Sequence, residues 1–470
     1  MGSLGSATIQ GTMITEPAVM PTWLDLGRSM AARGRLQQAL LCFEAAQESD
    51  PQSAEPLAER GLVLFKLNRP AEAMAAYTAA LTLAPDHSDT WLNLGVLYQV
   101  HGHFDEARSC FETVLARRPR FVIGWSNLAK MHRALGDIEA ALTCFREALR
   151  WAPDDPTIAL DCAMCQLMLG DFVGGWQGYE ARFQINAEPK ILPGRFPLWR
   201  GEPLDGRRLL VMTEQGFGDT FQFVRFVAAL AGLGAAVTLR APVRLLPVLS
   251  GLSVSCRLVD DIGAEERFDF EAPLMSLPLF LMPEAIMPPD PPRYLGSEAA
   301  RAARWASRLT DAAASLKIGI AWQGNPAFVD DINRSVPLSA FAGLAALPGV
   351  RLISLQVAVG LQQLQEAGVA VEQLGAIDVD GAFIDTAAII DGLDLVITSD
   401  TAVAHLAGAL GRPVWLALAK VPDWRWGMAG DTTPWYPAMR LFRQTDAGDW
   451  NAVFARIGAA LVTEYGLPAV

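Results

Sequence analysis

Two consecutive stretches of the sequence copy each other: WLNLGVLYQVHGHFDEARSCFETVLARRP, from Trp91 to Pro119, and WSNLAKMHRALGDIEAALTCFREALRWAP, from Trp125 to Pro153. Trp125 follows Trp91 by 34 residues, and Pro153 follows Pro119 by the same distance. Small residues, an aromatic residue and a turn glycine recur in phase between these ends. A fixed period of this length predicts an array of helix pairs, because each unit must stack on the next to bury its apolar face.

The array extends beyond these two copies. Leu57 and Trp23 continue the period toward the N-terminus, and a less regular fifth copy keeps Gly170 and Tyr179 in phase. The recurring Trp-Leu-Gly, Ala, Phe and Pro positions resemble the tetratricopeptide repeat. That resemblance implies about five repeats over residues 21–186, stacked into an α-solenoid whose groove binds extended protein segments. A purely structural spacer or a dimerisation surface is the alternative, and the sequence leaves self-association open.

The overall composition limits the classes of function. Of the 470 residues, 51% are apolar and 19% charged, which is enough apolar material for roughly two to four domains. The net charge of −13 and the lack of a Lys/Arg run exclude nucleic acid as a partner. The sequence shows neither a transmembrane run nor a signal core, so we expect a cytoplasmic protein whose residues 1–20 are disordered.

The remaining sequence alternates between strand and helix patterns. Residues 187–206 are rich in Pro and Gly and are predicted to be a linker. Short apolar runs then alternate with helical patterns, which predicts parallel sheets covered by helices. We expect two doubly wound, Rossmann-like α/β domains, over 207–294 and 295–470. The predicted strands are RRLLVM (207–212), AVTLR (236–240), KIGIAW (317–322), RLISL (351–355), DLVIT (394–398) and VWLAL (414–418).

Three polar clusters follow predicted strands, where ligands bind in sheets of this kind. The first cluster is a tight turn with five residues of interest: Glu214, Gln215, Gly216, Gly218 and Asp219. The two glycines begin like a dinucleotide-binding fingerprint, but the third glycine is missing, so NAD binding is rejected. One helix is expected to follow, over 220–234. Asp219 is either the cap of that helix or a catalytic base.

The second cluster is the long loop AWQGNPAFVDDINRSVPL, over 321–338. Gln323 and Asn325 supply polar side chains to this loop, and Arg334 and Ser335 precede a predicted helix. The planar guanidinium of Arg334 matches phosphate oxygens, and an ordinary surface arginine is the alternative.

The third cluster is SDTAVAHLAGALGRP, over 399–413. Ser399 or Asp400 is expected to cap a helix that begins near Thr401. The amide groups of Thr401 and Ala402 would then point into the cleft. Such a helix N-terminus binds anions through its free amides and its dipole.

His405 lies one helical turn after Thr401 and therefore on the same face. Two interpretations remain open at this position: an imidazole beside a bound phosphate, and a buried histidine satisfied by a backbone carbonyl. Because Thr401 and Arg334 are expected nearby, we favour the first interpretation, in which His405 lies beside a bound diphosphate.

These motifs resemble a known family. GFGD, IAWQGNP, NRS and DTAVAHLAGALGRPVW are similar to bacterial transferases of glycosyltransferase family 9, the heptosyltransferase-like group, over roughly 205–465. The order of repeats and transferase is also similar to the O-linked N-acetylglucosamine transferases. The resemblance implies a GT-B fold with an N-terminal acceptor domain and a C-terminal domain for a nucleotide-sugar co-substrate. It also implies inversion at the anomeric carbon without a catalytic metal or other cofactor.

The resemblance assigns roles to individual residues. Asp219 aligns with the general base of the family. Four residues match its D-T-x-x-x-H signature for the donor diphosphate: Asp400, Thr401, Ala402 and His405. Arg334 stands near a position where the heptosyltransferases use a Lys, and this departure leaves the donor open. Lys420 is a further cation beyond a predicted strand that could reach the donor.

The leading hypothesis is a hexosyl or heptosyl transferase whose repeats recruit a protein acceptor. Transfer to a lipid-linked or polysaccharide acceptor is a close alternative. An interaction scaffold with a sugar-nucleotide-sensing or inactive transferase domain is the alternative of another class, and an epimerase or hydrolase is a third. Trp424, Trp426 and Trp435 either wall the sugar or base, or pack in the core.

Overall fold

The computed structural model describes five ranges of the chain: 21–185, 194–282, 293–310, 316–327 and 331–468. The predicted disordered start, 1–20, and the first seven residues of the predicted linker, 187–193, lie outside these ranges. The chain forms two compact units, Met1–Met131 and His132–Val470. None of the helices in the described ranges combines the length and the apolar character that crossing a membrane requires.

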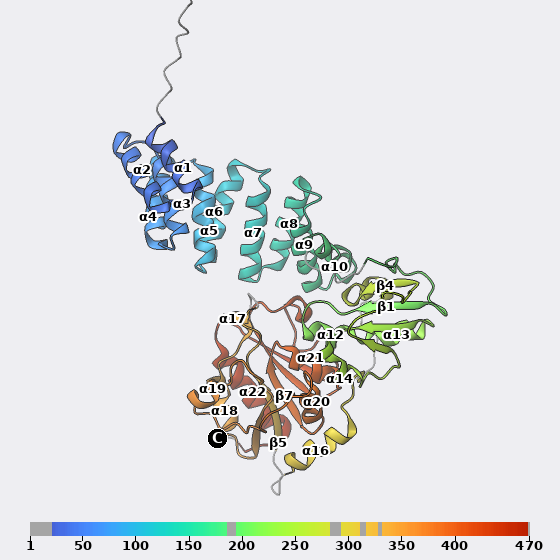
Figure 1. Cartoon of the computed structure of the whole chain (residues 1–470). Coiled ribbons are helices and arrows are strands. Elements are labelled where there is room, and N and C mark those ends of the chain that lie inside the picture. The colour runs from blue at the N-terminus through green and yellow to red at the C-terminus, as the bar shows by residue number, and fades with distance from the viewer. Residues whose placement is uncertain (1–20, 186–193, 283–292, 311–315, 328–330, 469–470) are drawn as a thin grey trace, which may run out of the picture. The chain divides into compact units, whose positions relative to one another are not determined.

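The N-terminal half consists of tetratricopeptide-like helix pairs (Figure 1). Within the first unit lie α1 (Trp23–Ala32), α2 (Leu36–Ser49), α3 (Glu55–Lys66), α4 (Pro70–Leu83), α5 (Ser88–Val100) and α6 (Phe104–Arg117). Helix α7 (Val122–Leu135) spans the boundary between the units. The second unit begins with α8 (Ile138–Trp151), α9 (Pro156–Met168), α10 (Phe172–Tyr179) and α11 (Arg182–Ile185).

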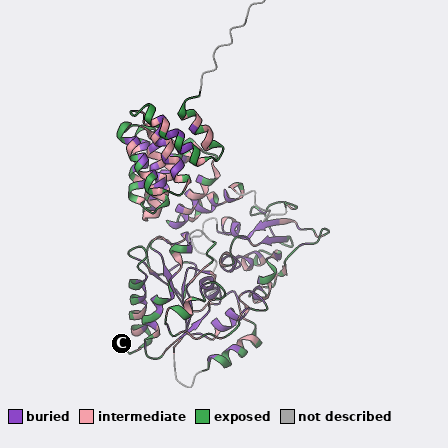
Figure 2. Ribbon diagram, turned by 60° about the vertical axis from the view of Figure 1, so that its left-hand side comes forward, coloured by how far each residue is buried: buried purple, intermediate pink, exposed green. Residues whose placement is uncertain are grey.

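Glycine and aromatic positions explain the close packing within each pair. A Cβ atom on Gly61 would stand 2.6 Å from the Tyr77 ring, and one on Gly95 would stand 2.7 Å from the Phe111 ring. Only a residue without a side chain allows the two helices to approach this closely. Buried and exposed residues alternate along these helices (Figure 2), as a stacked array with one covered and one open side requires.

The rest of the second unit contains two parallel sheets. The first has the strand order β3-β2-β1-β4, from β1 (Arg208–Met212), β2 (Ala236–Arg240), β3 (Arg257–Val259) and β4 (Phe270–Pro273). The second has the order β6-β5-β7-β8-β9, from β5 (Leu316–Ala321), β6 (Val350–Ser354), β7 (Leu395–Ser399), β8 (Val414–Leu418) and β9 (Met439–Arg443). All registered strand pairs are parallel. The expected parallel α/β architecture is confirmed at this level, and β3, β4 and β9 were not predicted.

The helix expected over 220–234 is two helices, α12 (Phe217–Phe223) and α13 (Phe226–Gly232). Arg225 lies at the break, and its Nε donates to the carbonyl oxygen of Gln222 at 2.8 Å. The side chain thus takes a carbonyl that a continuous helix would bond along its own backbone. The prediction of one helix was wrong because apolar periodicity does not reveal this local competition.

Strand order identifies the places where ligands bind in such sheets. The order reverses between β1 and β4 in the first sheet, and between β5 and β7 in the second. Loops that leave neighbouring strands in opposite directions open a crevice at these switch points. The three polar clusters of the sequence follow β1, β5 and β7. Topology therefore directs all three toward the crevices of the two sheets.

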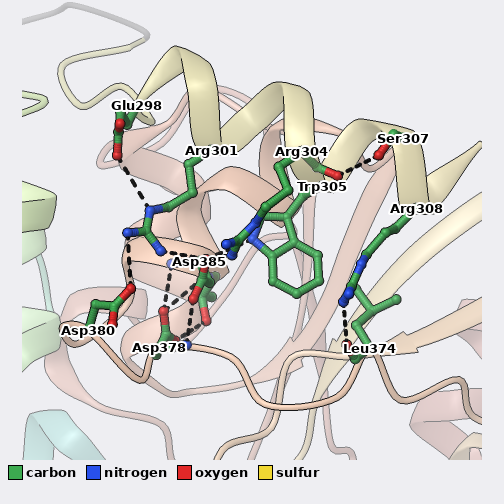
Figure 3. A network of polar contacts seen from close by, with 11 residues as sticks. Glu298, Arg301, Arg304, Trp305, Ser307, Arg308, Leu374, Asp378, Asp380 and Asp385 are labelled. Atoms are coloured by element: carbon green, nitrogen blue, oxygen red, sulfur yellow. Dashed lines mark hydrogen bonds and ion pairs between the residues drawn. The ribbon is translucent and has the colours of Figure 1, made fainter.

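A buried carboxylate anchors the helix that precedes the second sheet (Figure 3). Arg301, Arg304 and Trp305 project from α16 (Ala299–Leu309) and donate to Asp385 Oδ1 at 2.9, 2.8 and 2.7 Å. Asp385 lies in α20 (Ile384–Asp391). Burial raises the pKa of Asp385, but the bonds from Trp305 and Arg301 outweigh it and leave the pKa lowered. The carboxylate is therefore a structural clamp between α16 and α20.

Candidate functional site

The turn after β1 places Asp219 in the first turn of α12. Asp219 Oδ2 accepts a hydrogen bond from the amide of Gly216, the N-cap residue, at 2.8 Å. Its Oδ1 accepts from Nη2 of Arg425. The carboxylate thus bonds the N-cap amide from the third position of the helix, whereas the N-cap residue itself is Gly216 and not Asp219. It also pairs with a cation from the region of the second sheet.

Arg425 connects the two α/β regions and was missed in the sequence. It lies in the 3-10 helix η4 (Trp424–Trp426), and its side chain is only 8% exposed. Nη1 bonds Asp423 Oδ1 at 2.8 Å, and Nε bonds Gln222 Oε1 at 2.7 Å. Three partners fix the guanidinium plane, so Arg425 holds Asp219 in one orientation. The one sign of its importance in the sequence is that a charged residue stands between two tryptophans, Trp424 and Trp426.

The second glycine of the turn is where α12 meets α21 (Ala402–Ala409). A Cβ on Gly218 would stand 2.9 Å from His405 Cδ2 and 3.6 Å from His405 Nε2. It would also stand 3.6 Å from the Cα of Ala402. Gly218 is therefore required because α12 and α21 approach each other closely at this point, and this contact, not dinucleotide binding, explains the glycine.

His405 is buried in this contact, with 5% of its surface exposed. Its Nδ1 lies 2.9 Å from the hydroxyl of Tyr436, and its ring stacks on Trp426 at 5.2 Å between centroids. The partner is thus a hydroxyl and not the backbone carbonyl of the alternative interpretation. Burial lowers the pKa of His405 well below its ordinary value, and the charge of Arg425 adds to this effect. The imidazole is neutral at physiological pH, so it can donate a hydrogen bond but adds no charge.

The N-terminus of α21 differs by one or two residues from the prediction. Thr401, not Ser399 or Asp400, is the N-cap residue, and its side chain makes no capping bond. In the described part of the chain, no hydrogen bond from the amides of Ala402 and Val403 is present, and the buried Ser399 hydroxyl has no partner. A helix start with open donors and an unsatisfied buried hydroxyl beside it is suited to an anion.

Asp400 lies at the same helix start with 8% exposure. Burial raises its pKa to about 6, and the charge of Asp423 acts in the same direction. Trp426, Arg334 and Arg425 lower the pKa and offset part of this rise. The carboxyl group therefore gains a proton close to neutral pH, at a place where a bound anion would favour the protonated form.

The loop after β5 holds Arg334 through local bonds. Arg334 ends the single-turn helix α17 (Asp331–Arg334), and its Nε bonds Asp331 Oδ1 at 3.1 Å. The Ser335 hydroxyl donates to Asp331 Oδ2 at 2.9 Å and accepts from the Gly324 amide at 3.3 Å. The charge of Arg334 lowers the pKa of both His405 and Asp400. The structure therefore brings the second and third clusters together.

Two other residues of this loop have structural partners. Gln323 Oε1 accepts from Gln363 at 3.1 Å, which ties the loop to α19 (Gln363–Glu366). Asn325 is exposed and bonds the Ala327 amide at 3.0 Å, which closes a local turn.

Glu214 and Gln215 were expected to face the cleft, but their side chains bind the fifth repeat. Both Glu214 carboxylate oxygens accept from Arg182 at 2.9 Å, and Oε1 also accepts from the Met275 amide at 3.0 Å. The Gln215 amide donates to the Tyr179 hydroxyl at 3.0 Å. The expectation that these two side chains face the cleft was wrong, because the sequence does not show that the last repeat packs against the first sheet.

The same repeat contacts η4 through aromatic rings. Trp176 of α10 lies edge-on to Trp424 at 5.3 Å and to Phe223 at 5.7 Å. Trp424 and Trp435 are buried in this cluster, which is the packing role considered for them. Trp426 instead stacks on His405. Lys420, after β8, has an exposed side chain, and its amide donates to Gln444 at 3.3 Å.

Three comparisons place these observations among known proteins. The family model described as tetratricopeptide repeat matches residues 24–88 and 92–172. Protein FlbA of Caulobacter vibrioides is 28% identical over 469 residues, which cover 93% of this chain and 77% of FlbA. Both the family model and the fold therefore identify tetratricopeptide repeats in this chain. Such repeats indicate a role in protein interaction.

Two solved structures resemble about a third of the chain each. A structure of PilF from Pseudomonas aeruginosa is 22% identical, covers 36% of this chain and 76% of PilF, and has a TM-score of 0.34. A structure of MamA from Desulfovibrio magneticus RS-1 is 17% identical, covers 34% of this chain and 90% of that chain, and has a TM-score of 0.32.

Proposed function

We propose that this chain is an inverting glycosyltransferase of GT-B architecture, which moves a sugar from a nucleotide-sugar to an acceptor hydroxyl. The observation that carries the proposal is the meeting of α12 and α21. It sets one carboxylate, Asp219, which pairs with Arg425, beside a helix start with open amides. Arg334 adds a positive charge that acts on His405 of the same helix. A base for the acceptor hydroxyl and a positively charged region for the leaving diphosphate are what an attack on a diphosphate-activated carbon requires.

The donor diphosphate would lie at the N-terminus of α21. The amides of Ala402 and Val403, the helix dipole and the charge of Arg334 would stabilise it. Charge grows on the leaving diphosphate as the bond from its oxygen to the anomeric carbon breaks, so these groups stabilise the transition state more than the bound donor.

Asp219 would act as the general base. The acceptor oxygen forms the new bond to the anomeric carbon, and its proton passes to the Asp219 carboxylate. The bonds from Gly216 and Arg425 keep the carboxylate in place before the acceptor arrives. Attack from the face opposite the leaving group inverts the configuration.

The repeats would recruit a protein acceptor. Arrays of this kind bind extended protein segments along their groove. The FlbA alignment covers 93% of this chain, so it includes both the repeats and the α/β region. This joint occurrence supports a function in which the two parts act together.

Thermal unfolding with a panel of nucleoside diphosphates tests the proposal. One nucleotide at millimolar concentration should raise the melting temperature of the wild type, and the shift should be lost in Arg334→Ala and His405→Ala. Arg267→Ala is the matched control, because that side chain is 68% exposed and its partners among the described residues are Glu265 and nearby carbonyl groups. Asp219→Asn should keep nucleotide binding and lose transfer of the sugar. If no nucleotide shifts the wild type, the proposal fails and an interaction scaffold becomes the better explanation.

A further inference from the structure

Arg225, at the break between α12 and α13, is a buried cation whose hydrogen bonds all go to neutral groups. It is 3% exposed. Nη1 donates to the Trp435 carbonyl oxygen at 2.7 Å, and Nη2 donates to the Tyr294 hydroxyl at 2.9 Å. Its guanidinium carbon lies 4.8 Å from the centre of the Tyr436 ring. Buried arginines usually face a carboxylate, so this arrangement calls for another explanation.

The hydroxyl proton of Tyr294 is already used. Tyr294 donates to the Phe221 carbonyl oxygen at 2.8 Å and accepts from Arg225. A hydroxyl group has one proton to donate. Tyr294 therefore has no proton to offer to Tyr436, its neighbour in this cluster.

The Tyr436 hydroxyl lies 2.9 Å from His405 Nδ1, and either atom can supply the proton of this hydrogen bond. Burial raises the pKa of Tyr436 well above its ordinary value, and the proximity of Tyr294 adds to this effect, so the hydroxyl keeps its proton. An imidazole that accepts at Nδ1 carries its proton on Nε2 when it is neutral.

We propose that Tyr436 donates its hydroxyl proton to His405 Nδ1 and so fixes the neutral ring in the tautomer with the proton on Nε2. Arg225 and Tyr294 pack around Tyr436 and complete the cluster, which we call the relay. The Nε2–H group is then a ready donor at the junction of α12 and α21, where Gly218 leaves room beside it. Tyr436 is a positioning residue in this scheme. On the proposed transferase function, the Nε2–H group donates to an oxygen of the donor diphosphate without a change in its own charge.

The surroundings of His405 support a neutral ring. Burial is the largest effect on its pKa, followed by the charges of Arg425 in η4, Arg225 in the relay and Arg334 in α17, and all of them lower the pKa. Asp400, at the start of the same helix, ionises above about pH 6, and its carboxylate does not prevent the net lowering of the pKa of His405. A protonated imidazole would also lose the acceptor that Tyr436 requires.

The tautomer can be measured without any ligand. The full chain contains five histidines, so selective 15N labelling and long-range 15N–1H correlation give separate signals for pyrrole-type and pyridine-type nitrogens. His405→Gln assigns the signals. The expected result is a neutral ring with the proton on Nε2 between pH 5.5 and 8. A proton on Nδ1, or a charged ring in this range, overturns the proposal.

Three Tyr→Phe variants complete the test. Tyr436→Phe should redistribute the proton between the two nitrogens, whereas Tyr294→Phe should leave it on Nε2. Tyr77→Phe is the control, because its buried hydroxyl lies in the repeats and makes no hydrogen bond with the described residues. An unchanged tautomer in Tyr436→Phe overturns the relay. If Tyr436→Phe does not fold, the wild-type spectrum and the Tyr294→Phe spectrum still decide the matter.

Nucleotide binding separates this inference from the proposed function. A nucleoside diphosphate that stabilises the wild type should bind Tyr436→Phe about tenfold more weakly, the cost of one misdirected hydrogen bond to a charged group. Unchanged affinity with a changed tautomer would refute the positioning role of Tyr436. Failure of every nucleotide to bind the wild type would remove the transferase, while the tautomer result would stand by itself.

Discussion

Replacement of Asp400 by Asn should stabilise the protein, and the gain should grow with pH. Burial raises the pKa of Asp400 from 3.8 to about 6 in the folded state. The folded chain therefore binds this proton more tightly than the unfolded chain, and the free energy of unfolding falls as pH rises from about 4 to about 6. A difference of roughly two pKa units corresponds to about 3 kcal/mol above that window. An asparagine has no carboxylate to desolvate and avoids this loss.

Differential scanning calorimetry from pH 4.5 to pH 7.5 measures the effect. At about 2 °C per kcal/mol for a unit of this size, Asp400→Asn should melt about 6 °C above the wild type at pH 7.5 and close to it at pH 4.5. Asp446→Asn is the control, because Asp446 is exposed after β9 and its replacement removes the same formal charge without changing a buried group. An Asp400→Asn variant that melts below the wild type at pH 7.5 would show that the carboxylate is stabilised, not strained, in the folded chain.

Two further predictions concern packing. Gly218→Ala should lower the free energy of unfolding by about 1–3 kcal/mol, because the new Cβ would overlap His405, whose ring is held by a hydrogen bond and by stacking. Chemical denaturation measures this loss. Gly232→Ala is the control and should not lower the free energy of unfolding, because the space around its Cβ is open. Glu214→Gln should lower the free energy of unfolding by about 3–5 kcal/mol, because it leaves the buried charge of Arg182 without its main partner; a loss below 1 kcal/mol in the same assay would mean that Glu180 alone balances this charge.

The periodicity of the sequence predicted most of the fold. The repeats keep one period over several copies, and six of the nine strands in the described ranges are short, mainly apolar runs, so both patterns were visible without coordinates. The remaining strands are harder to see. β3 is only three residues long, and β9 (MRLFR) alternates arginines with apolar residues at the edge of its sheet. Strand order, which identifies the crevices, depends on contacts far apart in the chain.

The candidate site was predicted in its parts but not in its connections. Asp219, Arg334 and His405 could be selected because they follow strands and open helices. Arg425 and Tyr436 could not, because their roles depend on partners about 206 and 31 residues away in the sequence. For the same reason the sequence could not separate Asp219 from Glu214, two carboxylates in one turn whose partners lie in different parts of the fold.

The aromatic contact between Trp176 and Trp424 has a practical consequence for anyone who wishes to isolate the α/β region. A cut at the predicted linker would strip Trp176, Tyr179 and Arg182 from the rest, exposing Trp424 to water and leaving Glu214 buried without its arginine. Such a fragment would lose support for Arg425 at the same time. The smallest piece worth expressing therefore starts before α7 (Val122–Leu135), because the second compact unit begins at His132 within that helix.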